Sequence, residues 1–299
     1  MQAIRNAFRF INASLSLALK QVKLQEPWFV LGLGGLVILF VWFLPVGAVA
    51  GLIGLTPLGL TLIGLFALLA LACLLLWGEV TALLTSRTFA ALDAVDAEEP
   101  PANLKFLSAH AGTIILLALT LPLLALGDAL RNLFAKPEAL PDEKSRWLAA
   151  RTLGLPVVAV EGTTFQATLD RLRQIVQENL LRFREDLIKV RRVAGLIETL
   201  LIALGIVLGF AVGLKIAGPA EVDPWRRVLA AGIAMLIAWL PTIIGIMFST
   251  FTRACYATAL YQWVRNVASA RESGESGKAQ PPAILAEALG MANQNIKEG

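Results

Sequence analysis

Three acids and the only histidine of the chain are the residues whose types could carry acid–base chemistry: Glu79, Glu161, Glu198 and His110. Each is expected inside an apolar segment or at its end, where an ionised side chain is costly unless it has a partner. A proton relay would need titratable groups at neighbouring depths, and a shared cluster of these four could supply them. The alternative is that they hold helices together.

Motifs that would anchor an enzymatic reaction are missing from the sequence. There is no HExxH, GxSxG, Walker A or GxGxxG pattern. The two cysteines, Cys73 and Cys255, lie in or beside apolar segments without a CxxC spacing, which predicts buried free thiols. We therefore predict no catalytic residue, no metal site and no cofactor, and a protein that is not an enzyme.

The composition indicates a chain that is surrounded by hydrocarbon. Hydrophobic residues make up 57% of it and charged residues 16%, and the mean hydropathy is +0.70. The small basic excess lies beside apolar runs, which points to anionic lipid and membrane topology. No basic patch is interleaved with aromatic residues, so no nucleic acid partner is expected. The lipid bilayer is the expected partner.

Six apolar runs predict an all-α, polytopic transmembrane helical bundle of about six spans. A span needs about 20 apolar residues to cross roughly 30 Å of hydrocarbon. The fourth run is only about fourteen residues long and contains Pro156, so a re-entrant segment is the alternative there. The runs are Trp28–Val49, Leu58–Leu83, Phe106–Leu126, Trp147–Val160, Val193–Ala217 and Val228–Phe251.

Amphipathic segments complete the predicted layout. Residues 1–27 read as an interfacial amphipathic helix before spans one to four in 28–160. Residues 161–192 read as a basic amphipathic cytoplasmic helix, beginning at a capping box formed by Thr163 and Gln166. Spans five and six follow in 193–251. A cytoplasmic helix and tail, with a short terminal helix after a Gly/Ser/Pro linker, are expected in 252–299.

The distribution of basic residues predicts the orientation. With six spans, eighteen of the 26 lysines and arginines fall on the side of the termini and eight on the other side. Basic residues accumulate on the cytoplasmic side of membrane proteins. We therefore expect a multi-pass membrane protein with both termini inside.

Three glycines in the fifth predicted span share one helix face. Gly205, Gly209 and Gly213 follow one another at four-residue steps. Such a face lets a second helix approach closely because no side chain intervenes. The neighbouring helix could belong to the same chain or to another subunit.

Short motifs give the chain a family resemblance. They are Trp147, Pro156 and Glu161 at their spacing, the amphipathic stretch before the first span, and the aromatic run Tyr256–Trp263. On these residues the chain resembles an uncharacterised family of six-span bacterial membrane proteins, known as a domain of unknown function. The resemblance implies a fold and a location in a bacterial inner membrane, and no activity.

Two functions remain open at this point. The leading expectation is a non-enzymatic assembly, scaffold or accessory subunit that forms a homo-oligomer or joins a larger membrane complex. A small-molecule or ion transporter or channel is the alternative, with His110 and the acids beside a broken helix. A polar cavity that reaches the middle of the membrane would favour the transporter, whereas a solid apolar core would favour the subunit.

Overall fold

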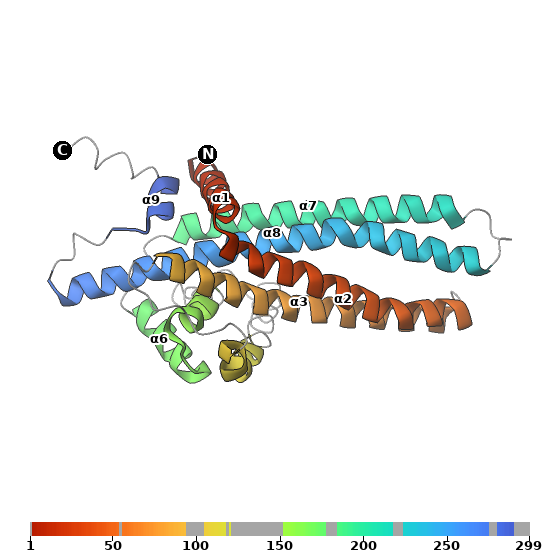
Figure 1. Cartoon of the computed structure of the whole chain (residues 1–299), viewed down its shortest axis with the longest axis horizontal. Helices are drawn as coiled ribbons and strands as arrows, with labels where there is room; N and C mark the ends of the chain where they lie inside the picture. Colours follow the sequence, from red (N-terminus) through yellow and green to blue (C-terminus); the bar gives the residue numbers. More distant parts are fainter. Residues whose placement is uncertain are drawn as a thin grey trace, which may run out of the picture. The chain divides into compact units, whose positions relative to one another are not determined.

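The computed structural model describes residues 2–53, 56–93, 105–117, 120, 152–177, 184–217, 224–274 and 280–289. Every regular element in these ranges is a helix, so the all-α prediction is confirmed for them. Two shorter helices, Lys105–Leu117 and Thr152–Glu161, accompany the labelled ones. The labelled helices are α1 (Gln2–Lys20), α2 (Val22–Leu52), α3 (Pro57–Asp93), α6 (Phe165–Gln177), α7 (Arg184–Ala217), α8 (Pro224–Glu272) and α9 (Ala283–Leu289) (Figure 1).

Four helices are long and apolar enough to cross a membrane, which indicates a membrane protein. They correspond to predicted spans one, two, five and six. The third and fourth predicted spans are represented by the shorter helices Lys105–Leu117 and Thr152–Glu161. Apart from Thr120, the remainder of both lies outside the described residues. The four candidate spans are Val22–Val49, Pro57–Leu92, Lys189–Gly213 and Val228–Glu272.

The chain divides into two compact units that do not follow chain order. Unit 1 comprises Met1–Pro27, Ala82–Val193 and Phe251–Gly299, and unit 2 comprises Trp28–Thr81 and Ala194–Thr250. The long helices α2, α3, α7 and α8 each contribute residues to both units. The segment 28–160, predicted to hold spans one to four, therefore belongs partly to unit 2 and partly to unit 1. Contacts between distant segments define each unit.

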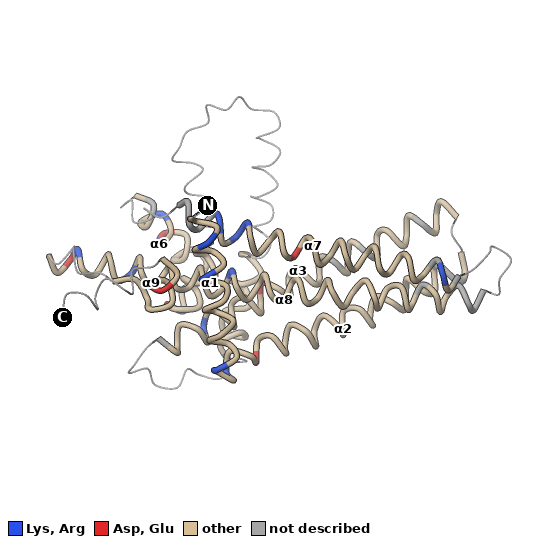
Figure 2. The backbone as a smooth tube through the Cα atoms, turned by 90° about the horizontal axis from the view of Figure 1, so that it is seen from above, with Lys and Arg blue, Asp and Glu red and all other residues tan. Residues whose placement is uncertain are grey.

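Unit 2 has an apolar core formed by helices from both ends of the sequence. Leu31, Leu74 and Ile246 are buried there, with the rings of Trp77 and Trp239 packed against them. The two indoles also donate hydrogen bonds to backbone carbonyls of α2, Trp77 to Val30 at 3.1 Å and Trp239 to Gly35 at 3.0 Å. Long stretches of these helices carry no charge (Figure 2). This is the composition of a bundle that lies in lipid.

The glycine face of α7 lies against α8 in unit 2. A Cβ atom built on Gly205 would lie 2.5 Å from the carbonyl oxygen of Ala238, and one on Gly209 would lie 2.5 Å from that of Ala234. A Cβ atom on Gly213 would lie 2.8 Å from the Cβ atom of Ala234. Real Cβ atoms do not come so close to other heavy atoms, so the two helices pack this tightly because these positions have no side chain.

Unit 1 is built around two thoroughly buried segments. In α8, nearly every described side chain from Phe251 to Val264 is buried, and in the Thr152–Glu161 helix the first eight are. A helix that is buried on all sides lies inside protein. The first and last described helices also meet in this unit, since α1 packs against α9. The predicted C-terminal helix thus begins at Ala283 and contacts the N-terminal helix of its own chain.

The basic amphipathic segment is seen as two helices. One face of α6 is buried through Thr168, Leu172 and Ile175, and residues 178–183 lie outside the described residues. Because α6 starts at Phe165, its N-cap residue is Thr164, one position after the Thr163 of the predicted capping box. The Thr163 hydroxyl lies 2.9 Å from that of Thr168.

The cysteines are free thiols, as predicted. Cys255 is buried in unit 1. Cys73 is only partly buried on α3, so the predicted burial is wrong for this residue.

Candidate functional site

The polar contacts of unit 1 gather at the end of the Thr152–Glu161 helix. We call this set the Glu161 junction. It consists of Glu161, Gly162, His110, Arg171 and Tyr261.

Glu161 is held by side chains from two other helices. The Tyr261 hydroxyl of α8 donates a hydrogen bond to the Oε1 atom of Glu161, and Arg171 Nε of α6 lies 3.5 Å from the same oxygen. The Tyr261 side chain is completely buried, whereas Glu161 and Arg171 are each 25% exposed. A carboxylate at the C-terminal end of a helix is opposed by the helix dipole. The phenol and the guanidinium offset this cost and tie α6 and α8 to the short helix.

Gly162 ends the short helix in a conformation that suits glycine. Its φ is +62°, and its N–H donates to the carbonyl of Val158 at 2.9 Å. A left-handed residue directly after a helix is a common C-cap and is usually glycine. The turn points the Gly162 carbonyl toward His110 of the Lys105–Leu117 helix, whose Nε2 atom lies 3.0 Å from that oxygen.

His110 has a carbonyl partner at each ring nitrogen. Nδ1 lies 3.0 Å from the carbonyl oxygen of Phe106, and Nε2 faces Gly162 as described above. A neutral ring donates to one of these oxygens, and a protonated ring donates to both. The imidazole also stacks on the Phe106 ring, with centroids 4.3 Å apart, and the Arg87 guanidinium lies 4.1 Å from the centroid of that ring. His110 thereby connects two short helices.

The other end of the Thr152–Glu161 helix has a polar contact as well. Arg191 Nη1 of α7 donates to the Thr152 hydroxyl at 3.1 Å. Both ends of this buried helix are therefore fixed by side chains that come from elsewhere in the chain. This pattern is typical of a structural element whose position must be defined.

The other two acids belong to unit 2. Glu198 of α7 accepts a hydrogen bond from the Ser249 hydroxyl of α8 at 2.7 Å. Gly245 allows this approach, because a Cβ atom there would lie 3.3 Å from the Glu198 carbonyl oxygen. Glu79 is half-buried on α3. The four candidate residues are thus divided, with His110 and Glu161 at one junction and Glu79 and Glu198 in the other unit.

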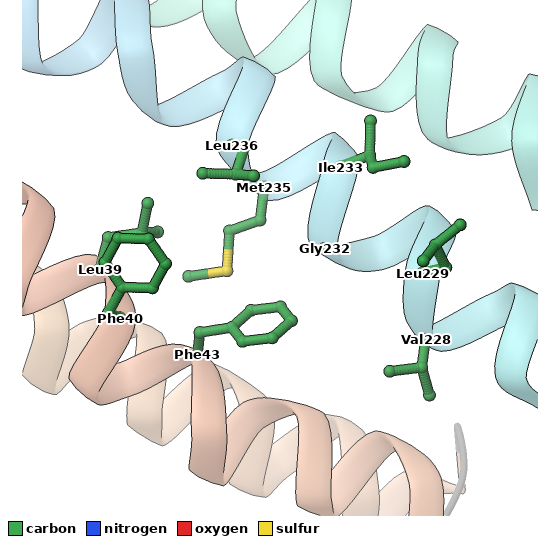
Figure 3. Close-up of a pocket in the computed structure, with 9 residues that line it drawn as sticks. All are labelled: Leu39, Phe40, Phe43, Val228, Leu229, Gly232, Ile233, Met235 and Leu236. Atoms are coloured by element: carbon green, nitrogen blue, oxygen red, sulfur yellow. The ribbon is translucent and has the colours of Figure 1, made fainter.

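Unit 2 also contains an apolar cavity of about 330 Å³ between α2 and α8 (Figure 3). No lining side chain carries a polar group. A polar solute or an ion requires polar groups to replace its water shell, and this cavity offers none. It suits a hydrocarbon group. The lining residues are Leu39, Phe40, Phe43, Val228, Leu229, Gly232, Ile233, Met235 and Leu236.

Metal binding has no basis in the residues that the structure describes. Among them, no group of three or more His, Cys, Asp or Glu side chains could hold an ion. The chemistry of the Glu161 junction is that of hydrogen bonds and one ion pair. Tyr261 and Arg171 did not stand out in the sequence as partners of Glu161, although Tyr261 lies in the aromatic run Tyr256–Trp263. An aromatic residue with a polar tip on a buried helix usually has a partner, and this signal could have identified it.

Comparison of the chain with protein-family models, with curated proteins and with solved structures finds no match. The class is therefore indicated by the four long apolar helices, which are typical of a helical membrane protein. The resemblance to a six-span family stays a prediction.

Proposed function

We propose that this chain is a non-enzymatic integral membrane protein that acts as an assembly or accessory subunit. The Glu161 junction supports this proposal most directly. The acid and the histidine that could have carried chemistry each contact two other groups and connect helices. In unit 2, Glu198 likewise connects two helices, because this residue of α7 accepts a hydrogen bond from Ser249 of α8.

We further infer a topology of four spans with both termini inside. The Thr152–Glu161 helix, which contains the described part of the fourth predicted span, is buried in protein, and its ten residues cover about 15 Å, about half of the hydrocarbon core. If the whole segment from 94 to 188 stays inside, only Lys215, Arg226 and Arg227 of the 26 basic residues lie in the outer connections. The excess of lysines and arginines on the inner side is then larger than with six spans, which leave eight of them outside. An even number of spans leaves both termini on one side in either case.

The transporter is the weaker alternative. It requires a polar path through the bundle, and the cavity between α2 and α8 is lined by apolar side chains only. The core around Leu31, Leu74 and Ile246 is equally apolar. These observations favour a bundle that anchors the chain over one that conducts a solute.

The mass of the protein in its native membrane tests the proposal. The chain, extracted with its surrounding lipid into polymer discs, should run as several copies or as one copy with a partner in fixed ratio. One copy of the chain has a mass of 32.1 kDa. Two differently tagged copies made in the same cells distinguish these results, since only a homo-oligomer carries both tags. A single 32.1 kDa chain in every preparation would contradict the proposal.

A further inference from the structure

Helix α1 has an apolar face that the protein itself covers. Its buried side chains are spaced by three or four residues, which places them on one side of the helix. Phe10 on this side meets the ring of Tyr256 edge-on at 4.9 Å between centroids, and α9 adds further contacts. Some of the apolar side chains that predicted an interfacial helix are therefore buried against other helices of unit 1. The buried residues are Ala7, Phe10, Ile11, Ser14 and Ala18.

A second apolar line on α1 is exposed. Ile4, Phe8 and Leu19 are 50%, 53% and 77% exposed. Their separations of four and eleven residues are close to whole helical turns, so the three side chains project in similar directions. Half-exposed Leu15 falls on the same line.

Each exposed apolar residue of this line is followed directly by a basic residue. The pairs are Ile4–Arg5, Phe8–Arg9 and Leu19–Lys20, and all three basic residues are exposed. The basic side chains therefore form their own line beside the apolar one. Between Gln2 and Lys20 the sequence contains no Asp or Glu. A helix with adjoining apolar and basic faces fits an anionic lipid surface.

The connection to the first span holds α1 at the membrane. Only Gln21 separates Lys20 from the candidate span that begins at Val22. The bend is fixed by hydrogen bonds: the Gln25 side-chain amide donates to the carbonyl of Ala18 at 3.0 Å, and the Leu24 N–H to that of Gln21 at 3.0 Å. The C-terminal end of α1, with Leu19 and Lys20, is thus within reach of headgroups where the span enters the bilayer.

We propose that the outer side of α1 binds anionic phospholipid. Ile4, Phe8 and Leu19 enter the boundary between headgroups and acyl chains, while the three adjacent basic residues contact phosphate groups. Each basic residue near an anionic surface raises partitioning about five-fold. This inference depends on the chain being a membrane protein and is independent of its assembly.

Spin labels on the full chain test the inference. A chain with Cys73→Ala and Cys255→Ala carries one label, at Phe8→Cys or at the control position Glu272→Cys, which is exposed at the C-terminal end of α8. It is reconstituted in vesicles of phosphatidylcholine and in an equal mixture with phosphatidylglycerol. We expect the access of a water-soluble nickel chelate to position 8 to fall several-fold with the anionic lipid and to recover in high salt. Position 272 should stay accessible in both lipids.

Charge variants complete the test. The triple variant Arg5→Gln/Arg9→Gln/Lys20→Gln should lose the response to anionic lipid, and the control Lys215→Gln/Arg265→Gln, with exposed basic residues elsewhere, should keep it. Equal access at position 8 in both lipids would overturn the inference, as would an unchanged response in the triple variant. If the Phe8→Cys chain does not fold, Leu19→Cys reports on the same line. The mass measurement above is unaffected by these outcomes.

Discussion

The two units of the molecule differ in the main contacts that hold their helices together, although Glu198 and Ser249 also form a polar contact in unit 2. In unit 2, α7 and α8 meet where side chains are missing, at Gly205, Gly209 and Gly213, over an otherwise apolar core. In unit 1, the Thr152–Glu161 helix is fixed at both ends by polar side chains from other helices. Lipid offers no hydrophobic driving force between helices, so the attraction between them must come from close packing. Polar contacts can define position where segments from distant parts of the chain converge.

The glycine contact gives the largest expected effect. Gly209→Leu would place side-chain atoms where the Ala234 carbonyl and the Ala238 Cβ atom already lie. Neither atom can move without shifting α8. We therefore expect the free energy of unfolding to fall by at least about 3 kcal/mol, or no folded protein. The measurement is thermal unfolding in detergent, followed by tryptophan emission.

Gly64→Leu on α3 is the matched control, since a Cβ atom there meets nothing within 4 Å. It should melt at or above the wild-type temperature. Equal melting of both variants and the wild type would remove the packing account of unit 2.

The Glu161 junction should show a smaller, coupled effect. Tyr261→Phe removes a buried hydroxyl whose partner is a carboxylate, and such a hydrogen bond contributes about 1.5–3 kcal/mol. Glu161→Gln removes the ion pair with Arg171 and weakens the same hydrogen bond. Because both variants affect one contact, the double variant should lose less stability than the two single losses together. Additive losses would show that the two side chains act independently.

The turn at Gly162 gives the smallest effect. With φ at +62°, Gly162→Ala should cost about 1–2 kcal/mol, because a Cβ atom disfavours the left-handed conformation. The new methyl group itself would fit, 3.7 Å from His110 Nε2. Gly154→Ala in the same helix is the control and should be neutral or stabilising, since its Cβ atom would lie 3.6 Å from Leu117 and alanine favours a helix. Melting temperatures in the reverse order would contradict this assignment.

The difference between the units also explains what the sequence could predict. The four long apolar helices and the glycine face of α7 are patterns within single segments, and composition and periodicity identify such patterns. The contacts of Glu161 join residues up to a hundred positions apart, which no local pattern reveals. The fourth predicted span was ambiguous for a physical reason. An apolar helix buried in protein has the same composition as one in lipid, and only its length differs.

The same limit applies to α1. Its apolar periodicity predicted an interfacial helix, but periodicity does not say which apolar side chains other helices cover. Ile11 and Ala18 are covered by protein, whereas Phe8 and Leu19 are exposed. The division of one amphipathic pattern into two faces required the tertiary structure.

The side of the membrane on which residues 94–188 lie is the most direct test of the four-span account. In a chain with Cys73→Ala and Cys255→Ala, single cysteines at Lys136 and at Glu221 are treated with a membrane-impermeant maleimide on intact cells. The account predicts labelling at Glu221→Cys and protection at Lys136→Cys until the membrane is permeabilised. Labelling of Lys136→Cys from outside intact cells would contradict it and would require two further crossings between α3 and α7.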